Sequence, residues 1–480
     1  MSETLFTTRQ PTLYEQLADE IDGQIQAGTF ECGDRLPSVR QVSQQKGLSV
    51  TTVLQAYHLL EDRGRIEARP QSGYYVRVPL PPTPAPQPQI TGQPFDPARV
   101  RIDDLVMRVM RDTLNQNLVQ FGAALPSPEL LPTNRLNRIL SRLARDNNPI
   151  FYTSGQPEGT LELRTQVARR AFMLGCPLAP DEVVITSGCT EALYLALSAV
   201  CTAGDLVAIE SPTYFGILQV LQSLGLRALE IPTHPTTGIS LEALRFAIEN
   251  HPVKAAVVMS NFGNPLGSLM PPENKRQLVH MLAAADIPLV EDDIYGELPF
   301  SGQHPGVAKS YDEKGLVLLA SSFCKDISPS FRIGWIAPGR FKDSVLRQKM
   351  ATSMSTAVLP QLAIAEFLES GGYDHHLRTI RRAYAQKVSQ MAHALVRYFP
   401  EGTLVTNPQG GFVLWVQMPP KVDSLALYHQ ALEAGITLAP GYLFSATPKY
   451  RNYIRLTAAY WSFTADRALQ RLGELVKQMA

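Results

Sequence analysis

Short apolar runs alternate with helix-like stretches through the larger, C-terminal part of the chain. Five runs consist almost entirely of apolar residues, at 183–186, 206–209, 255–259, 287–290 and 316–320. Runs of this length are typical of buried strands in a parallel sheet. Because helix-like segments separate them, the pattern predicts an open α/β sheet. Residues 101–120 are also expected to be helical, and a strand at 410–416 is expected to belong to a smaller α+β lobe.

Residues 1–78 follow a different pattern. The apolar positions of the first predicted helix recur every four residues, at Leu13, Leu17, Ile21 and Ile25. A capping box at Ser38 and Gln41 starts a second, short helix, and Ser49 caps a third that extends to residue 61. Residues 65–69 and 74–78 alternate like two strands of a hairpin. Two short helices followed by a two-stranded wing predict an α+β winged helix-turn-helix.

A proline-rich stretch separates the two parts. Residues 79–97 contain eight prolines in 19 positions and almost no charge. Such a segment forms neither helix nor sheet ladders, and as a stiff polyproline-II spacer it would reach about 50 Å. A disordered tether is the alternative. The predicted organisation is therefore a DNA-binding module at 1–78, a linker at 79–97 and a large module at 98–480.

Charge is balanced over the chain but uneven within the N-terminal module. The chain has 44 Lys and Arg residues and 44 Asp and Glu residues, so its net charge identifies no partner. Residues 1–33 carry one arginine and six acids, a net charge of −5, whereas residues 34–78 carry seven basic residues and four acids, a net charge of +3. The second part of the module therefore attracts phosphates, and the first helix is expected to face away from them.

Composition also bears on compartment and metal chemistry. The chain has five cysteines, an odd number without metal-ligand spacing, which is typical of a reduced cytosolic protein and predicts no metal site. Its N-terminus lacks the basic and apolar regions of a signal peptide, and no apolar run is long enough to span a bilayer. A soluble, cytoplasmic protein without membrane contact is expected.

Similarity to the GntR family of bacterial regulators is carried by RLPSVR at 35–40, SVTTV at 49–53 and ARPQSG at 68–73. The resemblance implies that helix 49–61 enters the major groove of double-stranded DNA. Some relatives have an arginine near position 54 or 55, where this chain has Leu54 and Gln55, although Gln55 has the amide that reads an adenine. A winged helix used only for protein contacts is the alternative. The residues implied to lie at the DNA are Arg40, Ser49, Thr51, Thr52 and Gly73.

A lysine follows the apolar run 316–320. Lys325 is expected to be partly desolvated there, which leaves a nucleophilic amine suited to a Schiff base with an aldehyde. Ser322 and Arg332 flank it and supply a neutral donor and a fixed cation, a pair suited to a phosphate. Taken alone, an ordinary surface lysine in a loop has the same appearance. Lysine, hydroxyl and arginine at these offsets resemble the internal aldimine segment of fold-type I pyridoxal-phosphate enzymes.

Two other predicted strands lead into groups that suit this cofactor. Gly188, Cys189 and Thr190 lie between a strand and a helix, where free backbone N–H groups and the helix dipole favour an anion. Tyr214 follows the next strand and is placed to stack on a planar heterocycle, although a core tyrosine has the same pattern.

The next two strands lead into an amide and a carboxylate. Asn264 precedes a proline and is therefore extended, so that its amide can donate to a phenolate oxygen. A buried Asp292 beside a pyridine nitrogen would keep that nitrogen protonated, and Tyr295 can share the phenolate oxygen. Because ligands of open α/β sheets bind at the carboxyl ends of the strands, these groups are expected to converge.

Residues 101–480 as a whole resemble a class I aminotransferase of fold type I, and behind a GntR-type winged helix the chain is similar to the MocR subfamily of transcriptional regulators. The resemblance implies pyridoxal 5'-phosphate held by Lys325 as an aldimine. It also implies Asp292 at the pyridine nitrogen, Asn264 and Tyr295 at the phenolate oxygen, and Tyr214 stacked on the ring. The residues that it implies at the phosphate are Gly188, Cys189, Thr190, Ser322 and Arg332.

Three further residues bear on assembly, substrate and phosphate affinity. Tyr152 matches the tyrosine that reaches the phosphate of the neighbouring subunit, which implies a homodimer. Arg455 matches the arginine that grips an α-carboxylate through two parallel hydrogen bonds, with a structural salt bridge as the alternative. Cys324 departs from the pattern, which usually has a second serine there, and a thiol is a weaker donor.

Two functions agree with these features. In the first, the protein is a DNA-binding regulator that binds pyridoxal 5'-phosphate and senses this cofactor, or an amino acid or amine bound to it. In the second, it is a pyridoxal-phosphate-dependent aminotransferase with the winged helix as an accessory module. The first is the primary prediction, because it explains 78 patterned residues and a proline arm.

Overall fold

The computed structural model describes residues 12–27, 29–30, 34–62, 65–69, 72–76, 97–100, 104–112, 115, 117–146, 150, 153 and 155–480. The chain divides into two compact units, Met1–Pro81 and Pro82–Ala480. Apart from Pro97, the predicted linker at 79–97 lies outside the described residues.

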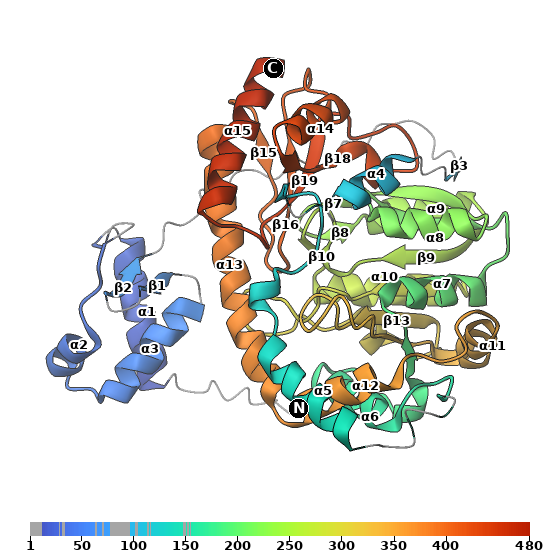
Figure 1. Ribbon diagram of the computed structural model, residues 1–480, viewed down its shortest axis with the longest axis horizontal. Coiled ribbons are helices and arrows are strands. Elements are labelled where there is room, and N and C mark those ends of the chain that lie inside the picture. The colour runs from blue at the N-terminus through green and yellow to red at the C-terminus, as the bar shows by residue number, and fades with distance from the viewer. Residues whose placement is uncertain are drawn as a thin grey trace, which may run out of the picture. The chain divides into compact units, whose positions relative to one another are not determined.

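The described part of the N-terminal unit consists of three helices and a hairpin (Figure 1). Its elements are α1 (Leu13–Gln26), α2 (Val39–Lys46), α3 (Val50–Asp62), β1 (Ile66–Arg69) and β2 (Gly73–Val76). The two strands are antiparallel, with Ile66 opposite Val76. The predicted winged helix-turn-helix is confirmed.

Local side-chain bonds set the ends of these helices. The Ser38 amide donates to Gln41 Oε1 over 2.9 Å, and the Gln41 amide donates back to Ser38 Oγ over 3.3 Å. Ser49 Oγ accepts from the Thr52 amide over 3.0 Å. Gly47 ends α2 in the left-handed conformation, with φ +63°. The helices and the wing share one buried cluster, formed by Leu17, Ala18, Ile21, Leu36, Val42, Val53, Ala56, Tyr57, Leu60, Ile66 and Val76.

The second unit is built on one large sheet. Its strands lie in the order β3 (Ala98–Arg99), β7 (Arg227–His234), β6 (Leu206–Ser211), β9 (Val253–Val258), β12 (Leu289–Asp292), β13 (Val317–Ser322), β14 (Gly334–Ala337) and β5 (Val184–Thr186). The five from β7 to β13 are parallel to one another. β14 runs antiparallel to both β13 and β5, so the sheet is mixed rather than wholly parallel. β8 (Gly238–Ile239) also pairs with β7.

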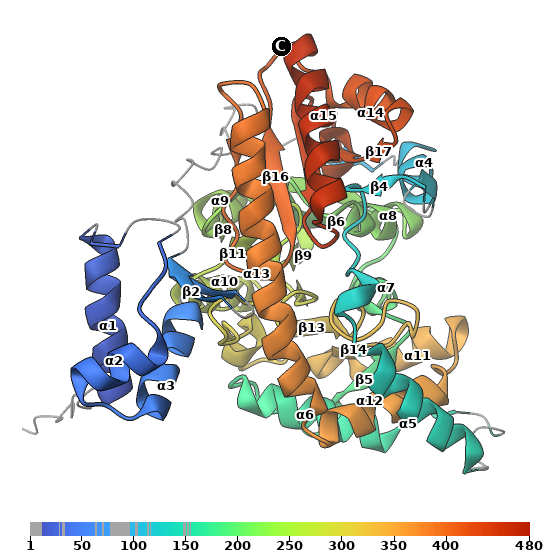
Figure 2. The same cartoon turned by 60° about the vertical axis from the view of Figure 1, so that its left-hand side comes forward.

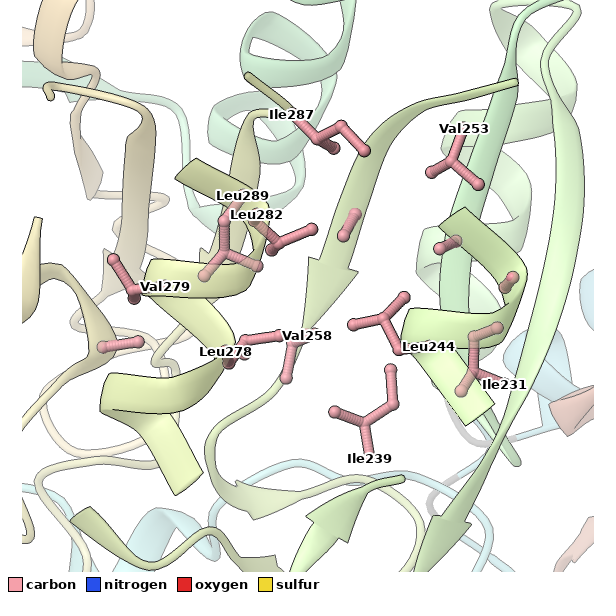
Figure 3. Close-up of a cluster of buried hydrophobic side chains, with 14 of the residues drawn as sticks. Ile231, Ile239, Leu244, Val253, Val258, Leu278, Val279, Leu282, Ile287 and Leu289 are labelled. Atoms are coloured by element: carbon pink, nitrogen blue, oxygen red, sulfur yellow. The ribbon is translucent and has the colours of Figure 1, made fainter. Parts of the chain in front are cut away.

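Helices follow the strands of this sheet: α7 (Cys189–Val200), α8 (Phe215–Ser223), α9 (Leu241–Asn250) and α10 (Pro272–Ala284). A buried cluster joins α9 and α10 to the sheet (Figure 3). Leu244 on α9 and Leu282 on α10 lie in it together with Val258 on β9. This apolar core fills the space between the strands and the two helices. The polar groups of the site therefore lie at the carboxyl ends of the strands.

Helices α5 (Thr133–Arg145), α6 (Leu161–Met173) and α12 (Val358–Glu369) pack together at one end of the unit (Figures 1 and 2). After β14 come α11 (Lys342–Thr352), α12 and the long α13 (Gly372–Tyr398). α13 lies beside α15 (Phe463–Met479) in both views (Figures 1 and 2). β10 (Asn261–Gly263) and β11 (Ser268–Leu269) form a small hairpin that leads to α10.

The smaller lobe contains a four-stranded sheet in the order β15 (Leu404–Val405), β16 (Val413–Gln417), β19 (Tyr453–Thr457) and β18 (Ala439–Pro440), with α14 (Ser424–Glu433) beside it. The predicted strand at 410–416 is therefore confirmed, although it begins at Val413. The predicted helix over 101–120 is partly wrong. α4 covers Asp104–Asp112, whereas Val119–Gln120 form β4, which pairs with β17 (Ile436–Thr437). None of the described helices has the length and apolar character needed to cross a bilayer.

Candidate functional site

The predicted site residues of the large unit lie at and after strand ends. Lys325 follows β13 and is half-buried. Its Nζ donates to the carbonyl of Ala124 over 2.5 Å and lies 5.5 Å from the centre of the Tyr295 ring. The lysine is therefore not a free surface residue. Its amine is held inside the unit by the loop that follows β4.

Asp292 ends β12 and is 1% exposed. Its Oδ1 accepts from the Ile294 amide over 3.1 Å and from Cys189 Sγ over 3.4 Å. Burial raises the pKa of Asp292 to about 6, against which these hydrogen bonds and the charge of Lys325 act. At pH 7 and above the carboxyl is thus mainly ionised, and it can accept a hydrogen bond from a protonated nitrogen. The hydrogen bond from the Cys189 thiol also links Asp292 to the start of α7.

Gly188 caps α7 in a conformation that favours glycine, with φ +84°. A Cβ at this position would lie 2.5 Å from Arg332 Nη2. Arg332 is exposed, and its Nη2 donates to the Ser187 carbonyl over 3.0 Å. The guanidinium therefore lies directly against a glycine turn at a helix N-terminus, where Thr190 is exposed as well. A cation, free amides and a helix dipole together suit a phosphate.

Ser322 and Cys324 are both buried and hydrogen-bonded to each other. Ser322 Oγ lies 2.9 Å from Cys324 Sγ and accepts from the Cys324 amide over 3.3 Å. The thiol that replaces the usual serine therefore engages the neighbouring hydroxyl. A ligand phosphate would have to compete with it for the Ser322 proton.

Arg455 on β19 is 1% exposed and only partly satisfied. Its Nη2 donates to the Gly122 carbonyl, and its Nη1 lies 3.5 Å from Asn264 Oδ1. Its Nε has no hydrogen-bond partner within the described part of the chain, and no described carboxylate pairs with it. Burial lowers the pKa of Arg455, as expected for a desolvated cation. The alternative of a structural salt bridge is therefore not seen among the described residues.

Tyr295 and Tyr214 complete this group. The Tyr295 hydroxyl is buried and has no partner among the described residues, and burial raises its pKa. Tyr214 caps α8 with its ring against Gly216, where an added Cβ would lie 2.3 Å from Cε1. Burial raises the pKa of Tyr214, while the positive charges of Lys325 and Arg455 lower it. The structure thus brings both tyrosines together with the lysine and the arginine.

Some groups at this site were not predicted from the sequence. The carbonyls of Gly122 and Ala124 hold Arg455 and Lys325, but a backbone acceptor leaves no signal in a side-chain pattern. Glu210 is 4% exposed, and burial raises its pKa to about 8. An acid near the end of an apolar strand was the available signal for Glu210. Tyr152 lies outside the described residues.

The candidate DNA-binding residues lie on the outside of the N-terminal unit. α3 buries Val53 and Tyr57 and exposes Thr51 and Gln55, so that one face packs and the other is free for a ligand. Arg40, Ser49 and Gly73 are exposed, and Thr52 is partly exposed. All five predicted contact residues therefore remain accessible on this unit.

Comparison with known proteins identifies both units. Residues 114–472 match the family described as aminotransferase class I and II, and residues 13–76 match the gntR family of bacterial regulatory proteins. Two uncharacterized HTH-type transcriptional regulators of Escherichia coli (strain K12), YdcR and YjiR, are each 38% identical to the chain, over 97% of its length and 99% of their own. The chain belongs to the MocR subfamily of GntR-type regulators.

Solved structures match the body of this MocR-type regulator. Kynurenine aminotransferase of Pyrococcus horikoshii, in complex with PMP, is 28% identical with a TM-score of 0.73, over 79% of this chain and 95% of that one. The α-aminoadipate aminotransferase LysN of Thermus thermophilus is 28% identical with a TM-score of 0.72, over 79% of this chain and 96% of that one. The body of the MocR-type regulator therefore has the fold-type I aminotransferase fold.

The residues of this MocR-type regulator fit pyridoxal phosphate. The glycine turn at Gly188 with Arg332 suits its phosphate, and the buried carboxyl of Asp292 suits its ring nitrogen. The Tyr295 hydroxyl is a buried donor that no described residue uses, which suits the phenolate oxygen. The described residues hold no group of three or more His, Cys, Asp or Glu side chains arranged for a metal ion.

Proposed function

We propose that the chain is a DNA-binding transcriptional regulator whose body binds pyridoxal 5'-phosphate at Lys325 and senses the cofactor or an amino compound. The observation that carries the proposal is that two buried groups, Tyr295 Oη and Arg455 Nε, have no hydrogen-bond partner among the described residues, with the Tyr295 ring 5.5 Å from Lys325 Nζ. Leaving a buried polar atom unpaired costs about 1–3 kcal/mol. Two such groups in one site are therefore best explained by a ligand that pairs with them.

The chain's own residues divide the work of holding this cofactor, which supplies an aldehyde and an electron-withdrawing ring when bound. Gly188, Cys189 and Thr190 present backbone N–H groups to its phosphate, and Ser322 and Arg332 add a hydroxyl and a cation. The support for these roles is the turn before α7 and the contact of Arg332 with that turn.

The ring would be held from three sides. Asp292 would accept a hydrogen bond from the protonated ring nitrogen, and its raised pKa of about 6 still leaves it mainly ionised at pH 7 to 8. Asn264 and Tyr295 donate to the phenolate oxygen, and Tyr214 stacks against the ring. Arg455 pairs with the carboxylate of an amino acid, since its Nε and charge have no other described partner.

Regulation rather than turnover is proposed as the main role. The two Escherichia coli relatives match 97% of the chain, winged helix included, and their names describe transcriptional regulators. The aminotransferases that match do so over 79% of the chain. A DNA-binding unit joined to a sensing body accounts for both units of the molecule.

On DNA, α3 would enter the major groove, with Arg40, Ser49, Thr51, Thr52 and Gly73 at the duplex. The support is the exposure of this face and its excess of positive charge. We further propose a cytoplasmic homodimer, in which Tyr152 of one subunit reaches the phosphate held by the other. Two winged helices would then contact two half-sites of one operator.

Borohydride reduction followed by peptide mapping tests cofactor binding. The purified protein should absorb visible light, and reduction should fix the cofactor to the peptide that contains Lys325. In Lys325→Ala neither visible absorbance nor label should remain, whereas Lys314→Ala, which removes an exposed lysine from the neighbouring segment, should keep both. Label on another lysine would overturn the proposal.

Selection from genomic fragments tests DNA binding. The full chain should retain a subset of fragments at least a hundredfold more tightly than bulk DNA at physiological salt. Retention of all fragments with equal affinity would refute specific regulation. Adding an amino compound that changes the cofactor spectrum should also change operator affinity, because a ligand and an operator that are coupled affect each other by the same factor.

A further inference from the structure

A fully buried lysine lies close to the glycine turn that is proposed to hold the cofactor's phosphate. Lys349, near the end of α11, is 0% exposed. α11 packs on α7, the helix that follows this turn (Figure 1). A lysine is rarely buried to this degree unless its charge is paired. The groups around its ammonium therefore indicate what this lysine does.

Three side chains surround the ammonium group of Lys349. Its Nζ lies 3.7 Å from Glu191 Oε2, and it donates to Thr356 Oγ1 over 3.1 Å and to Ser353 Oγ over 3.3 Å. The three N–H groups of the lysine thus face one carboxylate and two hydroxyl oxygens. Because these donors are engaged inside the unit, Lys349 can affect a ligand only through other residues.

The first of these partners leads directly to the turn. Glu191 lies in the first turn of α7, and its Oε2 accepts from the Ser187 amide. The carbonyl of Ser187 in turn accepts from Arg332 Nη2 over 3.0 Å. Lys349 is therefore linked through one carboxylate to the backbone that Arg332 contacts from the other side.

The second partner leads to the strand that enters the turn. Thr356 Oγ1 accepts from Lys349 and donates to the carbonyl of Ile185 on β5 over 3.4 Å. The lysine thus bridges the strand before the turn and the helix after it. Bonds on both sides of a short turn limit the conformations that its backbone can adopt.

Charge gives the lysine a second role at this turn. Glu191 carries a negative charge on the same helix end whose N–H groups, from Gly188 to Thr190, are proposed to bind a phosphate. Its side chain is 14% exposed, so water screens this charge only weakly. An uncompensated carboxylate at this place would repel a phosphate dianion. The ammonium of Lys349 supplies the opposite charge.

We propose that Lys349 is a positioning residue for the phosphate of the bound cofactor. It neutralises Glu191, and together the two side chains hold the Ser187 amide and thereby the turn that presents its N–H groups to the phosphate. The inference rests on the cofactor site proposed above. Because the pair acts on the phosphate turn, it should matter for a phosphorylated ligand and not for the same ligand without its phosphate.

Spectral titration of the cofactor-free full chain with pyridoxal 5'-phosphate and with pyridoxal tests this inference. The ratio of the two affinities measures what the phosphate contributes, whereas general damage to the fold would weaken both ligands. In Lys349→Met, affinity for pyridoxal 5'-phosphate should fall about tenfold, because Glu191 then repels the dianion, and affinity for pyridoxal should change less than threefold. Arg347→Met, which removes an exposed cation from the same helix, should leave the ratio unchanged.

A charge-neutral double variant separates compensation of charge from loss of structure. Lys349→Met combined with Glu191→Gln removes both charges and keeps an acceptor for the Ser187 amide. Its affinity ratio should return to within threefold of the parent value, and circular dichroism should show an intact fold. An unchanged ratio in Lys349→Met, or a double variant with a ratio well below that of the parent, would overturn the inference and leave the cofactor site in place. If the parent protein binds both ligands equally, the phosphate turn and the inference fail together.

Discussion

Replacing Arg455 with methionine separates recognition of a carboxylate from stability of the fold. Two N–H groups of the guanidinium contact Gly122 and Asn264, and its Nε has no described partner. Methionine keeps the apolar stem of the side chain and removes the charged guanidinium group. In the protein without ligand, removing the guanidinium leaves the Gly122 carbonyl and Asn264 Oδ1 without their donor, which costs about 1 kcal/mol of stability each. Removing a desolvated cation returns a similar amount.

The free energy of unfolding of Arg455→Met should therefore stay within about 2 kcal/mol of the parent value. Ligand binding should change much more. A carboxylate gripped by two charged hydrogen bonds loses both, and each contributes about 1.5–3 kcal/mol. A net loss of about 3 kcal/mol corresponds to roughly 140-fold weaker binding.

The assay is a titration of the cofactor's visible spectrum with an amino acid and with its decarboxylated amine. The amino acid should be the one that binds the parent protein most tightly in a panel. Arg455→Met should lose affinity for the amino acid about 140-fold, and affinity for the amine less than threefold. Arg451→Met, which removes an exposed arginine from the same lobe, is the matched control and should change neither affinity. Equal losses for the amino acid and the amine would refute the assignment of Arg455 to the carboxylate.

Three further changes test other parts of the molecule. Gly188→Ala should weaken cofactor binding at least tenfold in a spectral titration, because its Cβ would lie 2.5 Å from Arg332 Nη2 in a conformation that favours glycine; unchanged affinity would contradict the phosphate turn. The pKa of Glu210 is about 8 in the folded protein against an ordinary 4.5, so the folded state loses stability as the pH rises through this interval. Glu210→Gln removes this loss and should therefore stabilise the cofactor-free protein in urea unfolding more at pH 9 than at pH 5, by about 3 kcal/mol. A stability difference that does not change with pH would show that Glu210 does not titrate in that range. Arg40→Ala should weaken operator binding about tenfold in a mobility-shift assay and leave the cofactor spectrum unchanged; a changed spectrum would refute independent roles of the two units.

Local sequence patterns were sufficient to predict an element wherever the contacts that stabilise it are local. The ends of α2 are set by the reciprocal bonds of Ser38 and Gln41 and by the positive φ of Gly47, all within ten residues. The buried strands β6, β9 and β13 were visible because both of their faces are covered, which leaves an apolar run in the sequence. Because the predicted cofactor groups follow such apolar runs, the sequence alone also indicates which strand ends carry them.

Contacts between distant segments were decided only by the tertiary structure. β4 has no apolar run of its own that marks it as a strand, and it exists because β17, from far along the chain, satisfies its backbone. The bond from Cys189 to Asp292 and the grip of Gly122 on Arg455 likewise join residues that no periodicity connects.

Asp326 shows the same limit most clearly. It is 3% exposed and accepts from the Tyr373 hydroxyl on α13, yet nothing in the run around Lys325 indicates that the next side chain is buried. The sequence by itself determined which residues can form helices, strands and a cofactor set, because hydrogen bonding and burial of single elements act over a few residues. Only the tertiary structure decided which polar atoms are left without a partner, because that depends on every segment that packs around them.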